Sequence, residues 1–141
     1  MILYLDTSAW VKLYVHELGT KKLRVHAGNA EVLAASVVAY PEARATFARI
    51  KAQGISTEAK HQQRLAQLNL DWENMLRIEL VPAVVRTAGD LAEVYGLRGF
   101  DSIHLASALW LKEKTRTPLC FAVFDQRLRA AAERAGLVVV P

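Results

Sequence analysis

The sequence predicts a three-layer α/β/α fold around a central five-stranded, mostly parallel sheet. Five short apolar runs do not alternate with polar residues, so most of them are expected to be buried on both faces of a sheet. Helical stretches separate these runs, and strands that alternate with helices form parallel sheets with right-handed crossovers. The length of 141 residues, without repeats or a linker, predicts one domain that covers residues 1–141.

The expected strands and helices alternate along most of the chain. The strands are the apolar runs Ile2–Leu5, Val32–Ala35, Ile78–Val81, Leu119–Phe124 and Leu137–Val140. The helices cover residues 8–15, 37–52, 57–76, 82–95, 101–114 and 126–135.

Residues with known preferences for helix ends support these limits. Thr7 or Ser8 can cap the first helix, and Gly54 follows the second. The third helix carries apolar residues at helical spacing. Pro82 occupies a favoured first-turn position in the fourth. The fifth helix is apolar on nearly all sides, which predicts deep packing, and Gly136 ends the last one.

Composition narrows the class of protein. A net charge of +4 mildly favours polyanionic partners such as nucleic acid. The single cysteine, Cys120, cannot form an internal disulfide and indicates a reducing compartment such as the cytoplasm. No apolar run approaches the roughly 20 residues that span a bilayer. The N-terminal residues lack the basic region of a signal peptide, so we expect a cytoplasmic protein without membrane contact.

Four acidic residues are expected at one edge of the sheet. Asp6 directly follows the first strand, Asp125 follows the fourth, and Asp101 begins the helix that leads into the fourth strand. In open parallel sheets, sites form beyond the carboxyl ends of the strands, where the strand order reverses. Glu42 lies about one and a half turns into the helix after the second strand, so it can reach the same edge. Converging carboxylates repel one another unless a cation lies among them, and such oxygen ligands indicate Mg²⁺ or Mn²⁺.

Each of these acids also has a simpler interpretation. Aspartate is a preferred helix N-cap, and Asp6, Asp101 and Asp125 each precede a helix. Glu42, taken alone, is typical of a solvated helix surface. The hydroxyl residues that follow Asp6 can cap the first helix without it, and a glutamate inside a helix is not a cap. The four acids together therefore indicate a site more strongly than any one of them does.

Four further residues are candidates for supporting roles. Ser8 and Ser36 can hydrogen-bond a ligand carboxylate or a phosphate, or can cap helices instead. His104 follows Asp101 at the i,i+3 spacing that places two side chains on one helix face. It can position a ligand, although a packed core histidine is the more common case. Arg98 can contact a nucleic-acid backbone or remain an exposed loop residue.

Four stretches of the sequence resemble PIN-domain ribonucleases, in particular the VapC-type toxins of bacterial and archaeal toxin–antitoxin pairs. LYLDTSAWVKLY resembles the opening of those proteins, LRGFDSIHLASAL their central motif and FAVFDQRLRAAAERAGL their C-terminal motif. AASVVAYPEARATF is similar to the region that supplies a glutamate. The resemblance covers almost the whole chain in the same order. It implies that Asp6, Glu42, Asp101 and Asp125 are the catalytic residues and metal ligands.

The resemblance also implies an activity and partners. It implies a Mg²⁺-dependent endoribonuclease that hydrolyses RNA phosphodiester bonds and is the toxin of a VapBC-type system. A VapB-type antitoxin would block the site, and we expect a homodimer with Trp110 and Leu111 as candidate contacts. Two positions depart from the family. Val123 replaces the Thr or Ser that commonly stands two residues before the last aspartate, and Pro41 precedes Glu42.

Two other functions stay open on the sequence alone. The departure at Val123 leaves room for a catalytically weak or inactive PIN-like protein that binds RNA or serves as a scaffold. An unrelated α/β phosphatase would use an aspartate after the first strand as its nucleophile. The phosphatase predicts Asp-x-Asp at that point, whereas this chain has Asp6-Thr7-Ser8, which counts against it.

Overall fold

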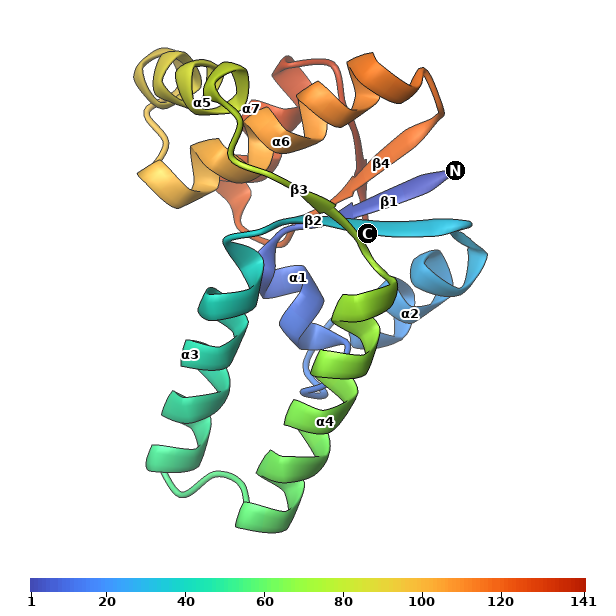
Figure 1. The fold of residues 1–141 in the computed structure, drawn as a ribbon, viewed down its shortest axis with the longest axis vertical. Helices are drawn as coiled ribbons and strands as arrows, with labels where there is room; N and C mark the ends of the chain where they lie inside the picture. Colours follow the sequence, from blue (N-terminus) through green and yellow to red (C-terminus); the bar gives the residue numbers. More distant parts are fainter.

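A parallel sheet of five strands crosses the middle of the molecule in the computed structural model, which describes all 141 residues (Figure 1). The strand order is β3-β2-β1-β4-β5. The strands are β1 Ile2–Leu5, β2 Val32–Ser36, β3 Leu76–Ile78, β4 Leu119–Ala122 and β5 Val138–Val140. Every neighbouring pair is parallel, so the prediction of a five-stranded, mostly parallel sheet is confirmed.

Helices cover both faces of this sheet. They are α1 Thr7–Lys12, α2 Thr20–Asn29, α3 Ala39–Ala52, α4 Glu58–Asn74, α5 Pro82–Tyr95, α6 Gly99–Thr115 and α7 Gln126–Arg134. In Figure 1, α1 to α4 lie below the sheet and α5 to α7 lie above it. The three predicted layers are therefore present.

The hydrophobic core lies on both sides of the sheet, as the uninterrupted apolar strands predict. Successive side chains of a strand point to opposite faces. In β1, Tyr4 accordingly packs with Phe121 of β4 and Leu105 of α6, whereas Leu3 packs with Trp10 of α1. Burying one large apolar side chain is worth roughly 1.5–3 kcal/mol. Two such clusters fix the sheet between its helices.

The strand order reverses at β1, the central strand. The chain first moves outward through β2 to β3, with α1 to α4 on one face, and then returns to β4 on the other side of β1, with α5 and α6 on the opposite face. Right-handed crossovers require the helices to change face when the direction of travel changes. The carboxyl end of β1 is therefore the reversal point, where open α/β sheets form their ligand sites.

Two elements differ most from the sequence prediction. Among the others, α1 ends at Lys12 rather than at residue 15, and β4 ends at Ala122 rather than at Phe124. Helix α2 was not predicted, because Leu23 is its only fully buried apolar side chain and one residue makes no helical period. Strand β3 spans Leu76–Ile78 rather than 78–81. It lies at the edge of the sheet, where the apolar residues Leu76 and Leu80 are exposed. An apolar run at this edge therefore does not show which residues pair with the neighbouring strand.

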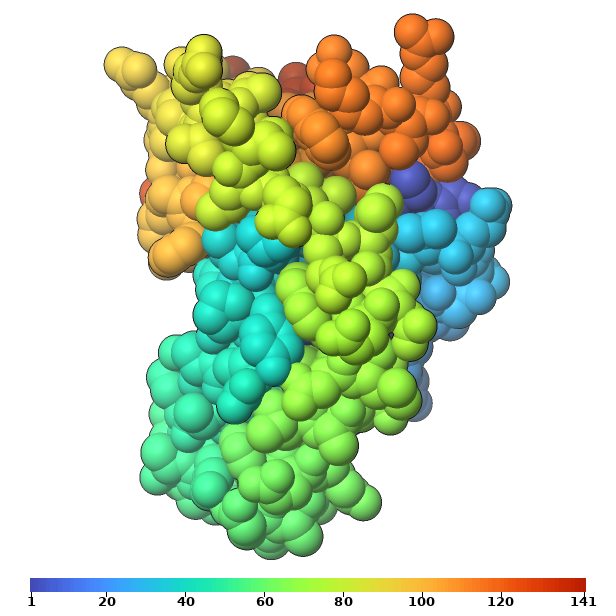
Figure 2. Space-filling view, in the orientation of Figure 1, coloured from blue at the N-terminus to red at the C-terminus, as the bar shows by residue number.

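Helices α3 and α4 form a hairpin that projects from the sheet (Figure 1). In the space-filling view this hairpin is a lobe of its own below the rest of the molecule (Figure 2). Its base packs on the body through Ala39, Ala43 and Phe47 of α3 and Leu68 of α4. No helix of the structure combines the length and the apolar character that a membrane span requires.

Candidate active site

Asp6 stands at the carboxyl end of β1 and caps helix α1. Its backbone is extended, and its Oδ1 atom accepts a hydrogen bond of 2.8 Å from the Ala9 N–H. We expected Thr7 or Ser8 to cap this helix, and that expectation was wrong. The cap uses one carboxylate oxygen of Asp6 and fixes the side chain at the reversal point of the sheet.

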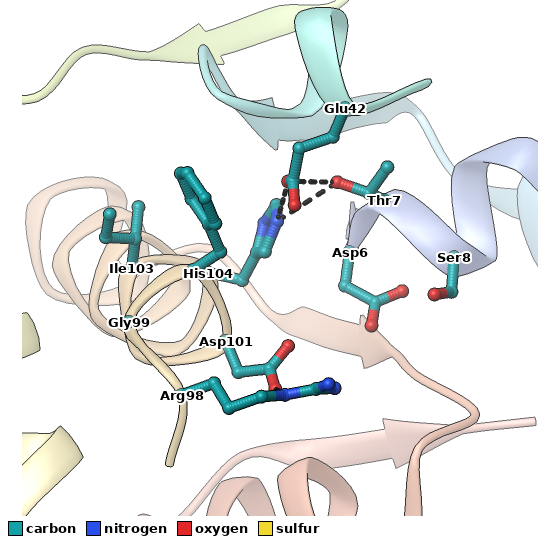
Figure 3. A pocket seen from close by; sticks show the side chains of 10 residues that line it. Asp6, Thr7, Ser8, Glu42, Arg98, Gly99, Asp101, Ile103 and His104 are labelled. Carbon is teal, nitrogen blue, oxygen red and sulfur yellow. Dashed lines mark hydrogen bonds and ion pairs between the residues drawn. The ribbon is translucent and has the colours of Figure 1, made fainter. Parts of the chain in front are cut away.

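A cavity of about 620 Å³ opens beside Asp6. Its wall is formed by Asp6, Thr7, Ser8, Glu42, Arg98, Gly99, Phe100, Asp101, Ile103 and His104. Three of the four predicted acids therefore meet here, from the end of β1, from α3 and from α6. Figure 3 shows the carboxylates of Asp6 and Asp101 pointing into the same space, with Glu42 approaching from the other side.

Asp6 is buried, with only 4% of the residue exposed. Burial raises its pKa to about 6, and the nearby charges of Asp101 and Glu42 add to this rise, although His104 and the Ala9 N–H oppose it. An ionised Asp6 is therefore costly among its neighbouring carboxylates. A cation beside it would offset that cost.

Glu42 is held in place by two donors. Its Oε1 atom accepts a hydrogen bond of 2.6 Å from the Thr7 hydroxyl and one of 2.9 Å from His104 Nε2 (Figure 3). Burial works to raise the pKa of Glu42, yet the hydrogen bonds from His104 and Thr7 hold it below its ordinary value. Glu42 is thus kept as a carboxylate on the rim of the cavity.

The other ring nitrogen of His104 contacts a buried tyrosine. The Tyr4 hydroxyl oxygen accepts a hydrogen bond of 3.1 Å from the Ser36 N–H, and lies 3.1 Å from His104 Nδ1. Burial raises the pKa of Tyr4, so its hydroxyl keeps its proton. Because the Glu42 carboxylate can only accept, the Nε2 atom of His104 carries a proton and donates it to Glu42. His104 is only 2% exposed, which agrees with the packed histidine expected there.

Asp101 and Arg98 form an ion pair on the opposite wall, with 3.2 Å between Arg98 Nε and Asp101 Oδ2. As the side chains stand, no three His, Cys, Asp or Glu residues are close enough together to hold a metal ion. The donor set nevertheless suits Mg²⁺ or Mn²⁺, because it consists of carboxylates, which such hard cations prefer. A bound cation would offset the cost of ionising buried Asp6, whose pKa is raised.

Asp125 does not share this cavity. It is exposed, caps α7 by accepting a hydrogen bond of 2.9 Å from the Leu128 N–H, and lines an adjoining cavity. Thr7 and Ser8 form part of the wall of both cavities. The prediction that four acids converge in one place is corrected to three acids in one cavity and the fourth beside it, because the chain runs two residues past the end of β4 before Asp125.

The prediction for Ser36 is also corrected. It is fully buried, and its hydroxyl accepts a hydrogen bond of 3.3 Å from the Val38 N–H in the turn before α3. Ser36 is therefore neither a residue of the cavity wall nor a helix cap, since the N-cap of α3 is Val38. Conversely, Tyr4 and Thr7 belong to the site although neither was predicted there. Thr7 could have been suspected from its place directly after Asp6. Nothing in the sequence marks Tyr4, because a tyrosine in an apolar strand looks like any core residue.

Comparison with known proteins identifies the family. The sequence matches the family model of the PIN domain over residues 3–134. This chain belongs to the PIN-domain family. Among its relatives, it is 36% identical to Ribonuclease VapC45 and to Ribonuclease VapC49 of Mycobacterium tuberculosis, over 99% of this chain and 95% of each relative. It is 31% identical to Ribonuclease VapC47 of the same species, over 97% of this chain and 94% of that protein.

Solved structures of PIN-domain proteins have the same fold. FitAcB from Neisseria gonorrhoeae superposes with a TM-score of 0.67 at 20% identity, covering 100% of this chain and 97% of the other. VapC20 of M. tuberculosis, a sarcin–ricin loop cleaving toxin, superposes with a TM-score of 0.65 at 16% identity, over 96% of each chain. PIN-domain ribonucleases of the VapC type generally depend on a divalent metal ion.

Val123, which stands where the family commonly has Thr or Ser, does not line the cavity. Val123 is fully buried in the cluster that contains Tyr4 and Phe121. We expect Val123→Thr to lower the free energy of unfolding by about 1–3 kcal/mol, because its hydroxyl enters an apolar core without a partner. Urea unfolding measures this loss, and RNA cleavage should not improve. A gain in cleavage at unchanged stability would mean that residue 123 does act on the site.

Proposed function

We propose that this PIN-domain protein is a divalent-metal-dependent endoribonuclease and the toxin of a VapBC-type pair. The observation that carries the proposal is the cavity at the carboxyl end of β1, where Asp6, Glu42 and Asp101 meet. Relatives that match nearly the whole chain are named VapC ribonucleases, which supports RNA as the substrate. Since Val123 lies in the core, it gives no support to an inactive RNA-binding protein.

Asp6 and Asp101 are the proposed principal ligands of Mg²⁺ or Mn²⁺, with Glu42 and Asp125 as further acids of the site. A bound ion would polarise the scissile phosphate and an attacking water. Thr7 and His104 keep Glu42 deprotonated and oriented. Asp6 is held rigidly by its cap on α1.

Positively charged and hydroxyl side chains of the cavity wall can bind the phosphate backbone of RNA. Arg98 is exposed on the wall of the cavity, where its guanidinium can contact a phosphate beside the scissile one. Ser8, in the wall shared by both cavities, can donate a hydrogen bond to a phosphate oxygen. The net charge of +4 favours approach of the RNA.

The proposed partners follow from the same family. Structural neighbours include VapBC2 from Rickettsia felis, bound to a DNA fragment from their promoter, and a toxin–antitoxin complex from Klebsiella pneumoniae. We infer a VapB-type antitoxin for this chain, and a cytoplasmic location, where RNA and a reducing environment occur together. A homodimer stays a prediction. Leu111 cannot provide its contact, because it is buried in the core, whereas Trp110 is partly exposed.

Cleavage of a mixed single-stranded RNA, with Mg²⁺ or Mn²⁺ and with EDTA, tests the function. We expect cleavage with metal only, and none in Asp101→Asn, which removes a charge from the cavity. Asp101 makes no cap on α6, so this variant should fold normally. The matched control is Asp90→Asn, an exposed acid on α5 outside the cavity, which should cleave like the wild type.

The same proteins give a second measurement. Mn²⁺ should raise the melting temperature of the wild type, because it binds the folded cavity and not the unfolded chain. At a Mn²⁺ concentration of 100 times Kd, the free energy of unfolding should increase by about 2.7 kcal/mol. An equal rise in Asp101→Asn would show that the ion binds elsewhere. Cleavage that persists in EDTA would contradict a metal-dependent enzyme.

A further inference from the structure

One aromatic side chain differs from all the others in its surroundings. The chain has 3 tryptophans, 4 tyrosines and 4 phenylalanines. Every one of these rings except that of Phe100 contacts another ring or lies beneath a cation. Phe100 is also the only exposed aromatic residue, at 57%. Its ring is therefore the one aromatic face that the fold leaves without a partner.

The unpartnered ring lies at the site. Phe100 directly precedes Asp101 in the first turn of α6, and both line the cavity that holds Asp6. The neighbouring residue is Gly99, where an added Cβ would meet no atom within 4 Å other than those of its chain neighbours and of its own helix backbone. The exposed guanidinium of Arg98 lies on the same wall. This rim thus offers a flat apolar face, free space beside it and a positive charge.

A nucleotide matches this combination. Unpaired bases stack on aromatic side chains, while their phosphates contact Arg and Lys. We propose that Phe100 contacts the substrate and stacks on an unpaired RNA base next to the scissile phosphate. The inference rests on the proposed ribonuclease function and defines the substrate more closely.

The chemistry of the ring sets the kind of selectivity. Phenylalanine has no group that could read the hydrogen-bonding edge of a base, and every base has a face that stacks. The contact therefore adds affinity without selecting one base. It does select for single strands and loops, since the bases of a duplex are stacked on their own neighbours.

Phe100→Ala tests the inference in the full-length protein. We expect the KM for a single-stranded RNA to rise about 5- to 150-fold, which corresponds to the 1–3 kcal/mol typical of one stacked base. The kcat should change much less, because the acids are untouched. Phe100→Tyr should behave like the wild type, and Phe100→Leu like Phe100→Ala. The matched control is Leu70→Ala, an equally exposed apolar residue on α4 away from the cavity.

Binding reports the stacking directly. The same RNA, with 2-aminopurine beside the cleavage position, is mixed with the protein in EDTA so that it stays intact. Quenching of the 2-aminopurine fluorescence is expected with the wild type and Phe100→Tyr, and should be lost with Phe100→Ala. Annealing the RNA to its complement should abolish the difference between the proteins.

Three results would overturn the inference. Unchanged KM and quenching in Phe100→Ala, with normal cleavage by the wild type, would reject the stacking role and leave the ribonuclease function intact. Full activity of Phe100→Leu would show that any apolar side chain is sufficient at this position, which would reject stacking on an aromatic ring. A wild type that neither binds nor cleaves any RNA would remove the proposed function and this inference together.

Discussion

Asp6→Asn should abolish RNA cleavage and yet make the metal-free protein more stable at neutral pH. Cleavage should fall to the level seen in EDTA, because the buried carboxylate proposed as a metal ligand is lost. Asparagine caps helices as well as aspartate does, so the bond from the Ala9 N–H should persist. The gain in stability comes from removing a charge that the fold buries at a cost.

The direction and the size of this stability gain follow from the pKa of Asp6. Burial raises the pKa of Asp6 to about 6, from an ordinary value of 3.8. Between these pH values the Asp6 carboxyl group is deprotonated in the unfolded chain but still protonated in the folded one. The free energy of unfolding of the wild type therefore falls as pH rises from about 4 to 6. The loss amounts to roughly 3 kcal/mol, since each pKa unit corresponds to 1.36 kcal/mol.

Urea unfolding in EDTA, from pH 4 to pH 7.5, measures the effect as the difference between wild type and variant. Asp6→Asn should be comparable to the wild type at pH 4 and more stable by the full amount near pH 7. Saturating Mn²⁺ should reverse the order by stabilising the wild type alone. A pH-independent difference would mean that Asp6 titrates at its ordinary pKa, and residual cleavage would remove it from the site.

Two substitutions at His104 should separate its two hydrogen bonds. Glutamine carries its amide near the position of Nε2 and can still donate to Glu42, whereas asparagine places its amide near Nδ1 and keeps only the contact with Tyr4. Loss of a residue that orients a metal ligand typically costs 10–100-fold in activity or metal affinity. We therefore expect a loss of about this size in His104→Asn and a smaller one in His104→Gln.

The pH–rate profile distinguishes positioning from a general loss of stability. Both variants leave a buried partner unsatisfied and should lose about 1–3 kcal/mol of stability. Only His104→Asn removes a hydrogen bond that lowers the pKa of Glu42. In this variant burial should raise that pKa, so the acidic limb of the profile should move to higher pH. Equal profiles and rates in the two variants would contradict the assignment.

Most of the fold could be predicted from the sequence because the strands at the centre of the sheet, β1 and β4, are apolar and largely buried on both faces. Long apolar helices such as α6, and helices with clear ends such as α5 between Pro82 and Gly96, were located to within a residue or two. The prediction failed where tertiary contacts, not local pattern, define an element. Helix α2 depends on Leu23 alone, and β3 on its pairing with β2.

The sequence predicted which acids belong to the site, but not how their side chains are directed or which residues hold them. Topology alone brings Asp6, Glu42 and Asp101 to one cavity, because the carboxyl ends of parallel strands share an edge. Side-chain direction beyond the end of β4, which turns Asp125 into the adjoining cavity, cannot be read from spacing. Of the two partners of Glu42, His104 was a candidate and Thr7 was missed. Tyr4 was missed too, because it contacts His104 from the middle of the sheet.

The hairpin of α3 and α4 divides the molecule into regions of unequal local stability. Its base anchors Glu42, but from residue 48 to residue 60 no side chain is buried. Segments with so few buried contacts open locally at a small fraction of the global unfolding free energy. The outer half of the lobe can therefore fray and exchange its amide hydrogens while Phe47 and Leu68 hold the inner half closed. A short peptide inserted near Gly54 would likewise be carried at the tip, far from the carboxylates.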